Sequence, residues 1–212
     1  MINLLHGDCL ELMKDIPDNS IDMVLTDPPY GTTQCKWDSV IDFDLMWKEL
    51  KRITKDNGAI CLFGVNPFTA NLIMSNAKNF KYDWYWKKQR GTGHLNAKKQ
   101  PMRDVELCSV FYYAQCTYYP QGLKAGYYNN GRPSHEKSGS LYGKQIKPVA
   151  TTITNYPKQL LEFDKVKNSV HPTQKPVALL EYLIKTYTLE NETVLDFTMG
   201  SGSTGVACKN LN

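Results

Sequence analysis

The sequence predicts an α/β fold with a mixed, mostly parallel sheet that contains an antiparallel hairpin strand, and with a small inserted lobe. Short apolar runs alternate with amphipathic stretches through the first third of the chain, and this alternation returns after residue 169. Residues 114–168 between them lack any sustained periodicity and are rich in Gly, Pro, Asn, Ser, Tyr and Lys. A non-periodic stretch of that length in a compact domain is usually functional, so we interpret it as a recognition lobe.

Local patterns predict the elements of the first third. Apolar runs bounded by turn residues indicate buried strands at Ile21–Leu25 and Ala59–Phe63, and a short strand at Ile2–Leu5. Apolar residues at helical spacing predict the helices Cys9–Lys14, Phe43–Ile53 and Pro67–Asn76. Strands that alternate with helices in this way favour a parallel sheet.

The remaining elements complete one domain around the lobe. Phe80–Lys87 and Val105–Tyr113 are expected to be antiparallel strands joined by a long loop, Lys88–Arg103. The last part is expected to contain the helix Val177–Tyr187, the strand Thr193–Phe197, a glycine-rich turn and the helix Ser203–Asn210. Residues 1–113 and 169–212 would then be two halves of one domain, with 114–168 inserted between them.

Composition narrows the class of protein. The 212 residues are 42% hydrophobic, which is enough for one core, and no apolar stretch approaches the roughly 20 residues of a membrane span. The six cysteines are scattered without a C-x-x-C pair, which disfavours disulfides and zinc. The N-terminus does not read as a signal peptide. We therefore expect a cytoplasmic protein that needs no metal and does not associate with a membrane.

Charge is distributed unevenly. Residues 81–175 carry 16 Lys and Arg against 6 Asp and Glu, and they hold 10 of the 13 tyrosines, although the whole chain has a net charge of only +4. Lysine and arginine bind phosphates and aromatic rings stack on bases, so this segment suits a nucleic acid. On charge alone, a solvated basic surface without a partner fits equally well.

The first chemical motif is Asp27-Pro28-Pro29-Tyr30, directly after an expected buried strand. The two prolines fix the backbone and supply no N–H, which makes a stiff turn at the end of a strand where α/β proteins bind ligands. Asp27 and the Pro28 carbonyl can accept both hydrogens of an aromatic amino group such as that of adenine, and Tyr30 can stack on the ring. The carboxylate would stabilise the positive charge that develops on the nitrogen. A stiff turn without a ligand is the structural alternative.

The second motif is a glycine turn between an expected strand and helix. Gly200, Gly202 and Gly205 form G-x-G-x-x-G after Asp196. Glycines let the backbone approach a ligand closely, and the following helix N-terminus favours an anionic group. That group is a pyrophosphate in a dinucleotide or the methionyl carboxylate in S-adenosylmethionine, whose amino group Asp196 could bind. A tight turn without a ligand is the alternative.

The third motif, His171-Pro172-Thr173-Gln174-Lys175-Pro176, precedes the Val177 helix. Thr173 or Gln174 can cap that helix, and Pro176 suits its first turn. Taken alone, this segment fits a helix start better than a binding loop.

The three motifs in this order resemble the amino-methylating DNA methyltransferases of the β arrangement, in which the catalytic motif comes first and the cofactor motif last. The resemblance covers nearly the whole chain apart from residues 114–168. It implies a Rossmann-like, circularly permuted methyltransferase fold, S-adenosylmethionine as cofactor and double-stranded DNA as partner. Asp27 at the catalytic position is typical of the adenine-N6 enzymes, since the cytosine-N4 enzymes more often carry serine there. The family continues into a further strand and helix, which this sequence does not contain.

The resemblance also implies roles for single residues. Asp27, Pro28, Pro29 and Tyr30 would hold an adenine flipped out of the duplex. Phe63, Trp86 and Lys87 resemble walls of the base pocket, and Arg132 in the lobe is a candidate base reader. The residues implied in cofactor binding are Asp8, Cys9, Asp27, His171, Thr173, Lys175, Asp196, Phe197, Gly200 and Gly202.

The sequence thus predicts site-specific methylation of adenine N6 in duplex DNA after base flipping. Several alternatives stay open: a cytosine-N4 DNA methyltransferase, an RNA or protein amino methyltransferase, a nicotinamide oxidoreductase, and a catalytically silent DNA-binding module. Whether the chain forms a homodimer or has a cognate restriction enzyme is also left open by the sequence.

Overall fold

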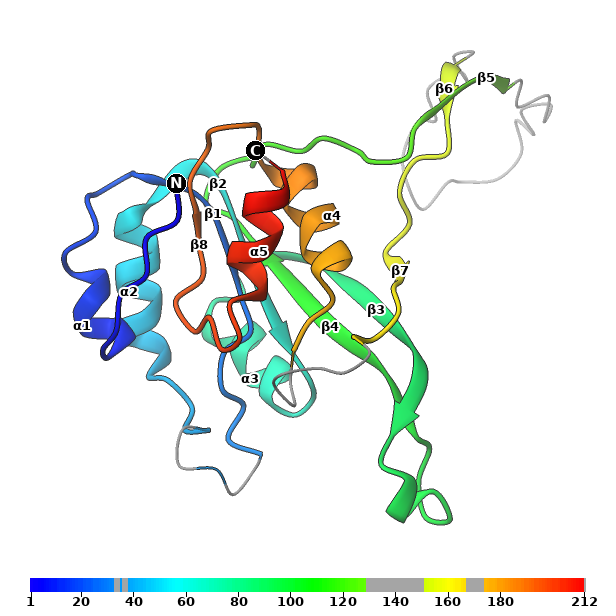
Figure 1. Cartoon of the computed structure of the whole chain (residues 1–212), viewed down its shortest axis with the longest axis horizontal. Coiled ribbons are helices and arrows are strands. Elements are labelled where there is room, and N and C mark those ends of the chain that lie inside the picture. Colours follow the sequence, from blue (N-terminus) through cyan, green and yellow to red (C-terminus); the bar gives the residue numbers. More distant parts are fainter. Residues whose placement is uncertain (33–34, 36–37, 129–150, 167–173, 212) are drawn as a thin grey trace, which may run out of the picture. The chain divides into compact units, whose positions relative to one another are not determined.

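A computed structural model of the chain describes residues 1–32, 35, 38–128, 151–166 and 174–211 (Figure 1). They form two compact units, Met1–Tyr119 with Lys158–Asn212, and Pro120–Pro157. The first unit therefore joins the two ends of the sequence. The second lies inside the predicted lobe but is smaller than it, because residues 114–119 and 158–166 of that stretch belong to the first unit. Within the described residues, every helix is too short or too polar to cross a bilayer.

A six-stranded sheet organises the first unit, in the order β7-β3-β4-β2-β1-β8. Its strands are β1 Ile21–Thr26, β2 Thr54–Gly64, β3 Phe80–Thr92, β4 Arg103–Phe111, β7 Leu160–Glu162 and β8 Val194–Leu195. The pairs β1–β2, β1–β8 and β3–β7 are parallel, whereas β2–β4 and β3–β4 are antiparallel. The expected mixed α/β sheet with an antiparallel hairpin is confirmed. The edge strand β8 brings the last part of the chain against β1 from the first part.

Helices cover both faces of this sheet (Figure 1). They are α1 Cys9–Met13, α2 Phe43–Ile53, α3 Phe68–Ser75, α4 Val177–Tyr187 and α5 Ser203–Asn210. Alternate residues of β2 point to opposite sides, because strand side chains have a period of two. Cys61 and Phe63 pack with α4 and α5, while Ile60 and Leu62 pack with α1, α2 and α3. Two apolar cores therefore enclose the strands, as expected for a largely buried sheet.

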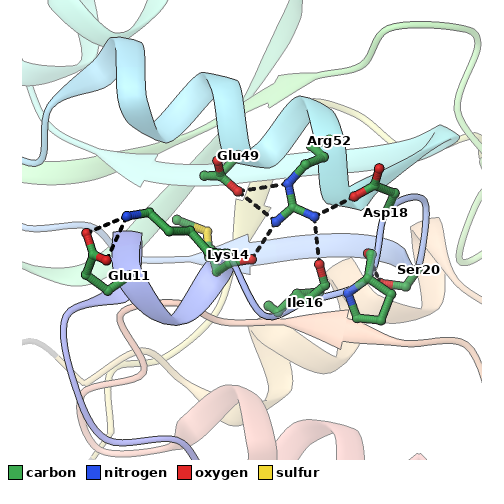
Figure 2. A network of polar contacts seen from close by, with 9 residues as sticks. Glu11, Lys14, Ile16, Asp18, Ser20, Glu49 and Arg52 are labelled. Atoms are coloured by element: carbon green, nitrogen blue, oxygen red, sulfur yellow. Dashed lines mark hydrogen bonds and ion pairs between the residues drawn. The ribbon is translucent and has the colours of Figure 1, made fainter.

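An arginine on α2 holds the chain that follows α1 (Figure 2). Arg52 donates to the main-chain carbonyls of Met13 at 2.7 Å and Ile16 at 2.8 Å. It also pairs with Glu49 at 2.7 Å and Asp18 at 2.5 Å. The guanidinium fork thus fastens α1 and its exit loop to α2 through several directed bonds.

The second unit contains one described antiparallel pair, β5 Lys124–Tyr128 with β6 Thr151–Thr154. The Asn155 side chain donates to the Gly122 carbonyl at 2.6 Å and holds the two ends of this pair together.

Some local expectations differ from the structure. Part of the stretch predicted as an inserted lobe, β7, pairs with β3 in the main sheet, and the strand predicted at Thr193–Phe197 is limited to Val194–Leu195. Ile2–Leu5 is not a strand, since its residues are exposed and pair with none of the described strands. The Lys88–Arg103 segment is not a plain loop, since β3 continues to Thr92 and a short 3-10 helix, η1 His94–Asn96, lies at the turn. Pro176, rather than Gln174, is the N-cap of α4, and Thr173 lies outside the described residues.

Candidate active site

A cavity of about 420 Å³ lies where β1 and β8 end. Parallel strands present their carboxyl ends at one edge, and ligands of open α/β sheets bind there. Expected site residues from both halves of the sequence line it: Asp27, Pro28, Pro29, Tyr30, Phe63, Lys175, Asp196 and Gly200. A cavity of this volume falls within the range of small-molecule sites, about 300–1,000 Å³.

A second carboxylate, that of Asp38, binds the backbone of the turn that contains Asp27. The main-chain N–H groups of Gly31 and Thr32 both donate to Asp38 at 2.9 Å. Gly31 has a φ of +66°, and a Cβ there would lie 2.9 Å from Val40 Cγ2, so any other residue would be strained. These contacts orient Asp27 and Tyr30 toward the cavity.

Both oxygens of the Asp27 carboxylate accept hydrogen bonds. The Tyr30 hydroxyl donates to one oxygen, and the Lys175 ammonium donates to the other. The Tyr30 ring packs on Phe68 with centroids 5.0 Å apart. Burial and the neighbouring Asp27 raise the pKa of Tyr30 well above its usual value, which keeps the phenol neutral.

Lys175 is the centre of a buried cluster of charges. Its Nζ lies 3.4 Å from Glu106 Oε2 and 5.1 Å from the centre of the Phe63 ring. The other Glu106 oxygen accepts a bond from Lys88. Burial alone would lower the pKa of Lys175, but Asp27 and Glu106 outweigh it and the pKa lies above its usual value. The ammonium is therefore charged beside the expected catalytic carboxylate.

Sequence reasoning missed Glu106 and Lys88. Glu106 lies on β4 close to Arg103 and Asp104, so its sequence context does not set it apart from an ordinary surface carboxylate. Burial would raise its pKa, but Lys175 and Lys88 together lower it below the usual value. Glu106 Oε2 accepts no hydrogen bond within the described part of the chain. The 3.4 Å ion pair with Lys175 is the contact that this oxygen does make, and it leaves the oxygen able to accept a further hydrogen bond.

Asp196 joins the two halves of the site. It accepts hydrogen bonds from Thr26 Oγ1 and Thr204 Oγ1, each at 2.6 Å, although Thr26 is 170 residues away in the sequence. The Thr198 hydroxyl donates to the Asp27 carbonyl at 3.1 Å. Burial raises the pKa of Asp196 above its usual value, and the hydrogen bonds from the threonine hydroxyl groups offset only part of this effect. The β1 turn and the glycine turn are thus tied together by side chains.

The glycine turn has the backbone that its sequence predicts. Gly200 and Gly202 have φ values of +51° and +75°, which only glycine adopts readily. Gly202 is the N-cap of α5, and no side chain caps this helix start. Ser203 and Thr204 in its first turn line the cavity, so main-chain N–H groups lie close to any ligand bound there.

The other expected site residues lie elsewhere. Gly202 lines a second cavity of about 740 Å³, which shares Asp196, Met199, Ser201 and Thr204 with the first. Asp8 caps α1 by accepting from Leu10 N at 2.8 Å, with Cys9 beside it, and neither lines a described cavity.

Trp86 is buried and donates to the Phe163 carbonyl at 2.8 Å, and Phe197 packs beside the α2 core. Lys87 pairs with Glu162 at 2.9 Å, whereas His171, Thr173 and Arg132 lie outside the described residues.

Comparison with known proteins assigns this site to a family. The DNA methylase family matches residues 21–212. This chain belongs to the DNA methylases. The match includes both the β1 turn and the glycine turn, so the residues that line the cavity fall within the family's own sequence pattern.

Curated relatives of this DNA methylase are methyltransferases. It is 26% identical to Type II methyltransferase M2.MboI of Moraxella bovis, over 97% of this chain and 78% of that protein. With Type II methyltransferase M.HinfI of Haemophilus influenzae it shares 28% identity, over 98% of this chain and 62% of the relative. It is 30% identical to the putative methylase YubD of Escherichia coli, over 98% and 79% of the two chains.

Solved structures give the same fold. The M1.HpyAVI–SAM complex matches this DNA methylase with a TM-score of 0.61 and 26% identity, over 100% of this chain and 90% of the other. The cytosine-N4-specific PvuII DNA methyltransferase matches with a TM-score of 0.66 over 97% and 77% of the chains, at 17% identity, which speaks for the fold alone. The expected family, fold, enzyme class and cofactor, S-adenosylmethionine, are confirmed.

Proposed function

We propose that the cavity between β1 and α5 is where this DNA methylase methylates the N6 amino group of an adenine extruded from duplex DNA. One observation carries the proposal. The Asp27 turn and the Asp196 glycine turn, far apart in the sequence, line the same cavity and are hydrogen-bonded to each other. Base and cofactor would therefore meet at one place, which is what direct methyl transfer requires.

The residues around the glycine turn suit S-adenosylmethionine. Asp196 can accept from its amino group, and the uncapped N-terminus of α5 can receive its carboxylate. When bound, S-adenosylmethionine supplies a methyl group on a positively charged sulfur. The positive φ of Gly200 lets the backbone turn without a side chain that would occupy the ligand's space.

Asp27 and the Pro28 carbonyl would accept the two amino hydrogens of the flipped adenine, and Tyr30 would stack on the base. With S-adenosylmethionine bound, the amino nitrogen would take up the methyl group as the methyl–sulfur bond breaks. Asp27 would stabilise the positive charge that develops on this nitrogen until one of its protons passes to solvent. Base flipping costs about a few kcal/mol, which contacts to the extruded base must offset.

Lys175 must share Asp27 with the incoming base. Its ammonium occupies one carboxylate oxygen in this structure, where an amino hydrogen would otherwise bind. Glu106 Oε2, 3.4 Å from Lys175 Nζ and without a hydrogen bond in the described part of the chain, offers an alternative acceptor. A shift of Lys175 toward Glu106 would free Asp27 for the base without leaving the ammonium unpaired.

The test is methyl transfer from labelled S-adenosylmethionine into unmethylated bacterial genomic DNA, followed by nucleoside analysis. We expect N6-methyladenine from the wild-type protein and at most a trace from Asp27→Ala. N4-methylcytosine as the product would favour the cytosine alternative, and label in RNA but not in DNA would favour an RNA enzyme. Wild-type turnover by Asp27→Ala would overturn the assigned role.

Double-stranded DNA is the expected partner of this protein, and the cytoplasm is its expected location. Residues 114–168, with Arg132, would contact the groove and phosphates of double-stranded DNA. The reaction would take place in the cytoplasm. A homodimer and a cognate restriction enzyme stay predictions, which light scattering and sequencing of modified bases in cells that express the protein can test.

A further inference from the structure

The strands β3 and β4 continue past the sheet as a two-stranded extension (Figure 1). Lys87 pairs with Val105 and Thr92 with Arg103, with an irregularity between the two pairs. We name residues 89–104 the β3–β4 arm. Its turn contains Gly93, which has a φ of +91° and nothing within 4 Å of the position of a Cβ. The end of the arm is therefore surrounded by open space within the described structure.

The arm combines positive charge with an exposed apolar tip. Arg90, Lys98, Lys99 and Arg103 lie on it, against a single acidic residue, Asp104. None of the four basic side chains forms an ion pair with an acidic residue among those described. Leu95, at the turn, is 98% exposed. The arm therefore presents a cationic ribbon, without ion pairs among the described residues, that has an exposed leucine at its tip.

The arm begins at the active site. Lys88, the residue before it, pairs with Glu106, which lies 3.4 Å from Lys175, which in turn pairs with Asp27. Leu95 is the seventh residue after Lys88, so the tip can extend at most about 23 Å from Lys88. A DNA duplex whose target base reaches Asp27 would therefore lie within reach of the arm.

We propose that the β3–β4 arm enters a groove of the duplex beside the target adenine and that Leu95 inserts into the base stack to stabilise the extruded state. The proposal rests on the proposed function. The major groove, about 12 Å wide, admits a two-stranded ribbon. Apolar wedges, leucine among them, open base steps in other DNA-binding proteins. The four basic residues would meet phosphates on either side.

The first experiment separates insertion from general binding. Modified-base sequencing of DNA methylated by the wild-type protein identifies its site, and two duplexes are then made with that site. In one the target adenine is paired, and in the other it faces an abasic position, where extrusion costs less. We expect Leu95→Ala to lower the rate on the paired duplex by about tenfold or more, and by less than about twofold on the other.

The matched control is Met74→Ala, on α3, because Met74 is also a largely exposed apolar residue, at 76%. It should leave both rates unchanged, whereas Leu95→Met should retain most of the rate on the paired duplex. Equal loss by Leu95→Ala on both duplexes, or no loss on either, would overturn insertion. If the wild-type protein transfers no methyl group to any DNA, the proposed function itself fails, which is a different result.

The second experiment tests the charge of the arm. The affinity for a random-sequence duplex is measured against salt concentration for a Lys98→Gln, Lys99→Gln double variant. Loss of two phosphate contacts should reduce the slope of log affinity against log salt by about 1.8. The control is Lys48→Gln with Lys51→Gln on α2, both exposed, which should leave the slope unchanged. Equal slopes for the wild-type protein and the arm variant would show that the arm does not contact the backbone of DNA.

Discussion

Two clusters of charge, one around Arg52 and one around Lys175, differ in how completely they are paired. Each guanidinium nitrogen of Arg52 has a partner, and these partners include two main-chain carbonyls (Figure 2). Lys175 lies between two carboxylates, one of which keeps an oxygen without a hydrogen bond in the described structure. The first cluster therefore ties α1 and its exit loop to α2, whereas the second contains a carboxylate oxygen that can still accept a hydrogen bond.

The largest effect should come from Asp27→Asn, which breaks the second cluster where the reaction takes place. The amide retains the shape but not the charge that stabilises the developing cation, so we expect a loss of turnover of about 10³-fold. Steady-state methyl transfer measures it, at a temperature where urea denaturation shows that the variant is folded. A variant that keeps its turnover would show that the carboxylate charge has no part in the reaction.

Arg52→Ala should lower the stability of the protein and leave its turnover nearly unchanged. It removes bonds to the Met13 and Ile16 carbonyls and leaves Glu49 without its partner, so we expect a loss of about 2–3 kcal/mol in the free energy of unfolding. Urea denaturation measures the loss, and turnover well below the melting temperature should stay near the wild-type value. Arg52→Lys should recover only part of the stability, because an ammonium cannot reproduce the fork.

Glu106→Gln tests whether the charge of Glu106 stabilises the Lys175 cluster. We expect the free energy of unfolding to fall by about 1–2 kcal/mol near neutral pH. The lowered pKa of Glu106 means that its ionised form contributes stability above its unfolded pKa of about 4.3. This contribution disappears as the pH falls through the lower folded pKa. Urea midpoints between neutral and acid pH should therefore converge for wild type and variant, and a constant difference would contradict the assignment.

Replacement of Asp8 should have the smallest effect, and it distinguishes a helix cap from a cofactor contact. As N-cap of α1, its replacement by alanine should cost about 1 kcal/mol, whereas asparagine, which caps equally well, should cost little. The family resemblance instead predicts a cofactor contact that depends on the carboxylate. Calorimetry with S-adenosylmethionine decides: weaker binding by Asp8→Asn supports that contact, and unchanged binding leaves Asp8 as a helix cap.

Local patterns predicted much of the fold and the two turns at the centre of the site. The helices α2 and α4 have the predicted bounds, since amphipathic spacing is a property of the segment itself. Gly200 and Gly202 have the positive φ that their motif predicts. These features depend on neighbours in the sequence, so the sequence by itself determined them.

Contacts between distant segments were decided by the tertiary structure. The partnership of Lys175 with Glu106 depends on β4 and the start of α4 meeting in space, and no local pattern specifies it. Ile2–Leu5 has the apolar pattern of a strand, yet it is exposed and pairs with none of the described strands. Strand pairing and burial follow from the packing of the whole chain, whereas turns and helices follow from short-range sterics and periodicity.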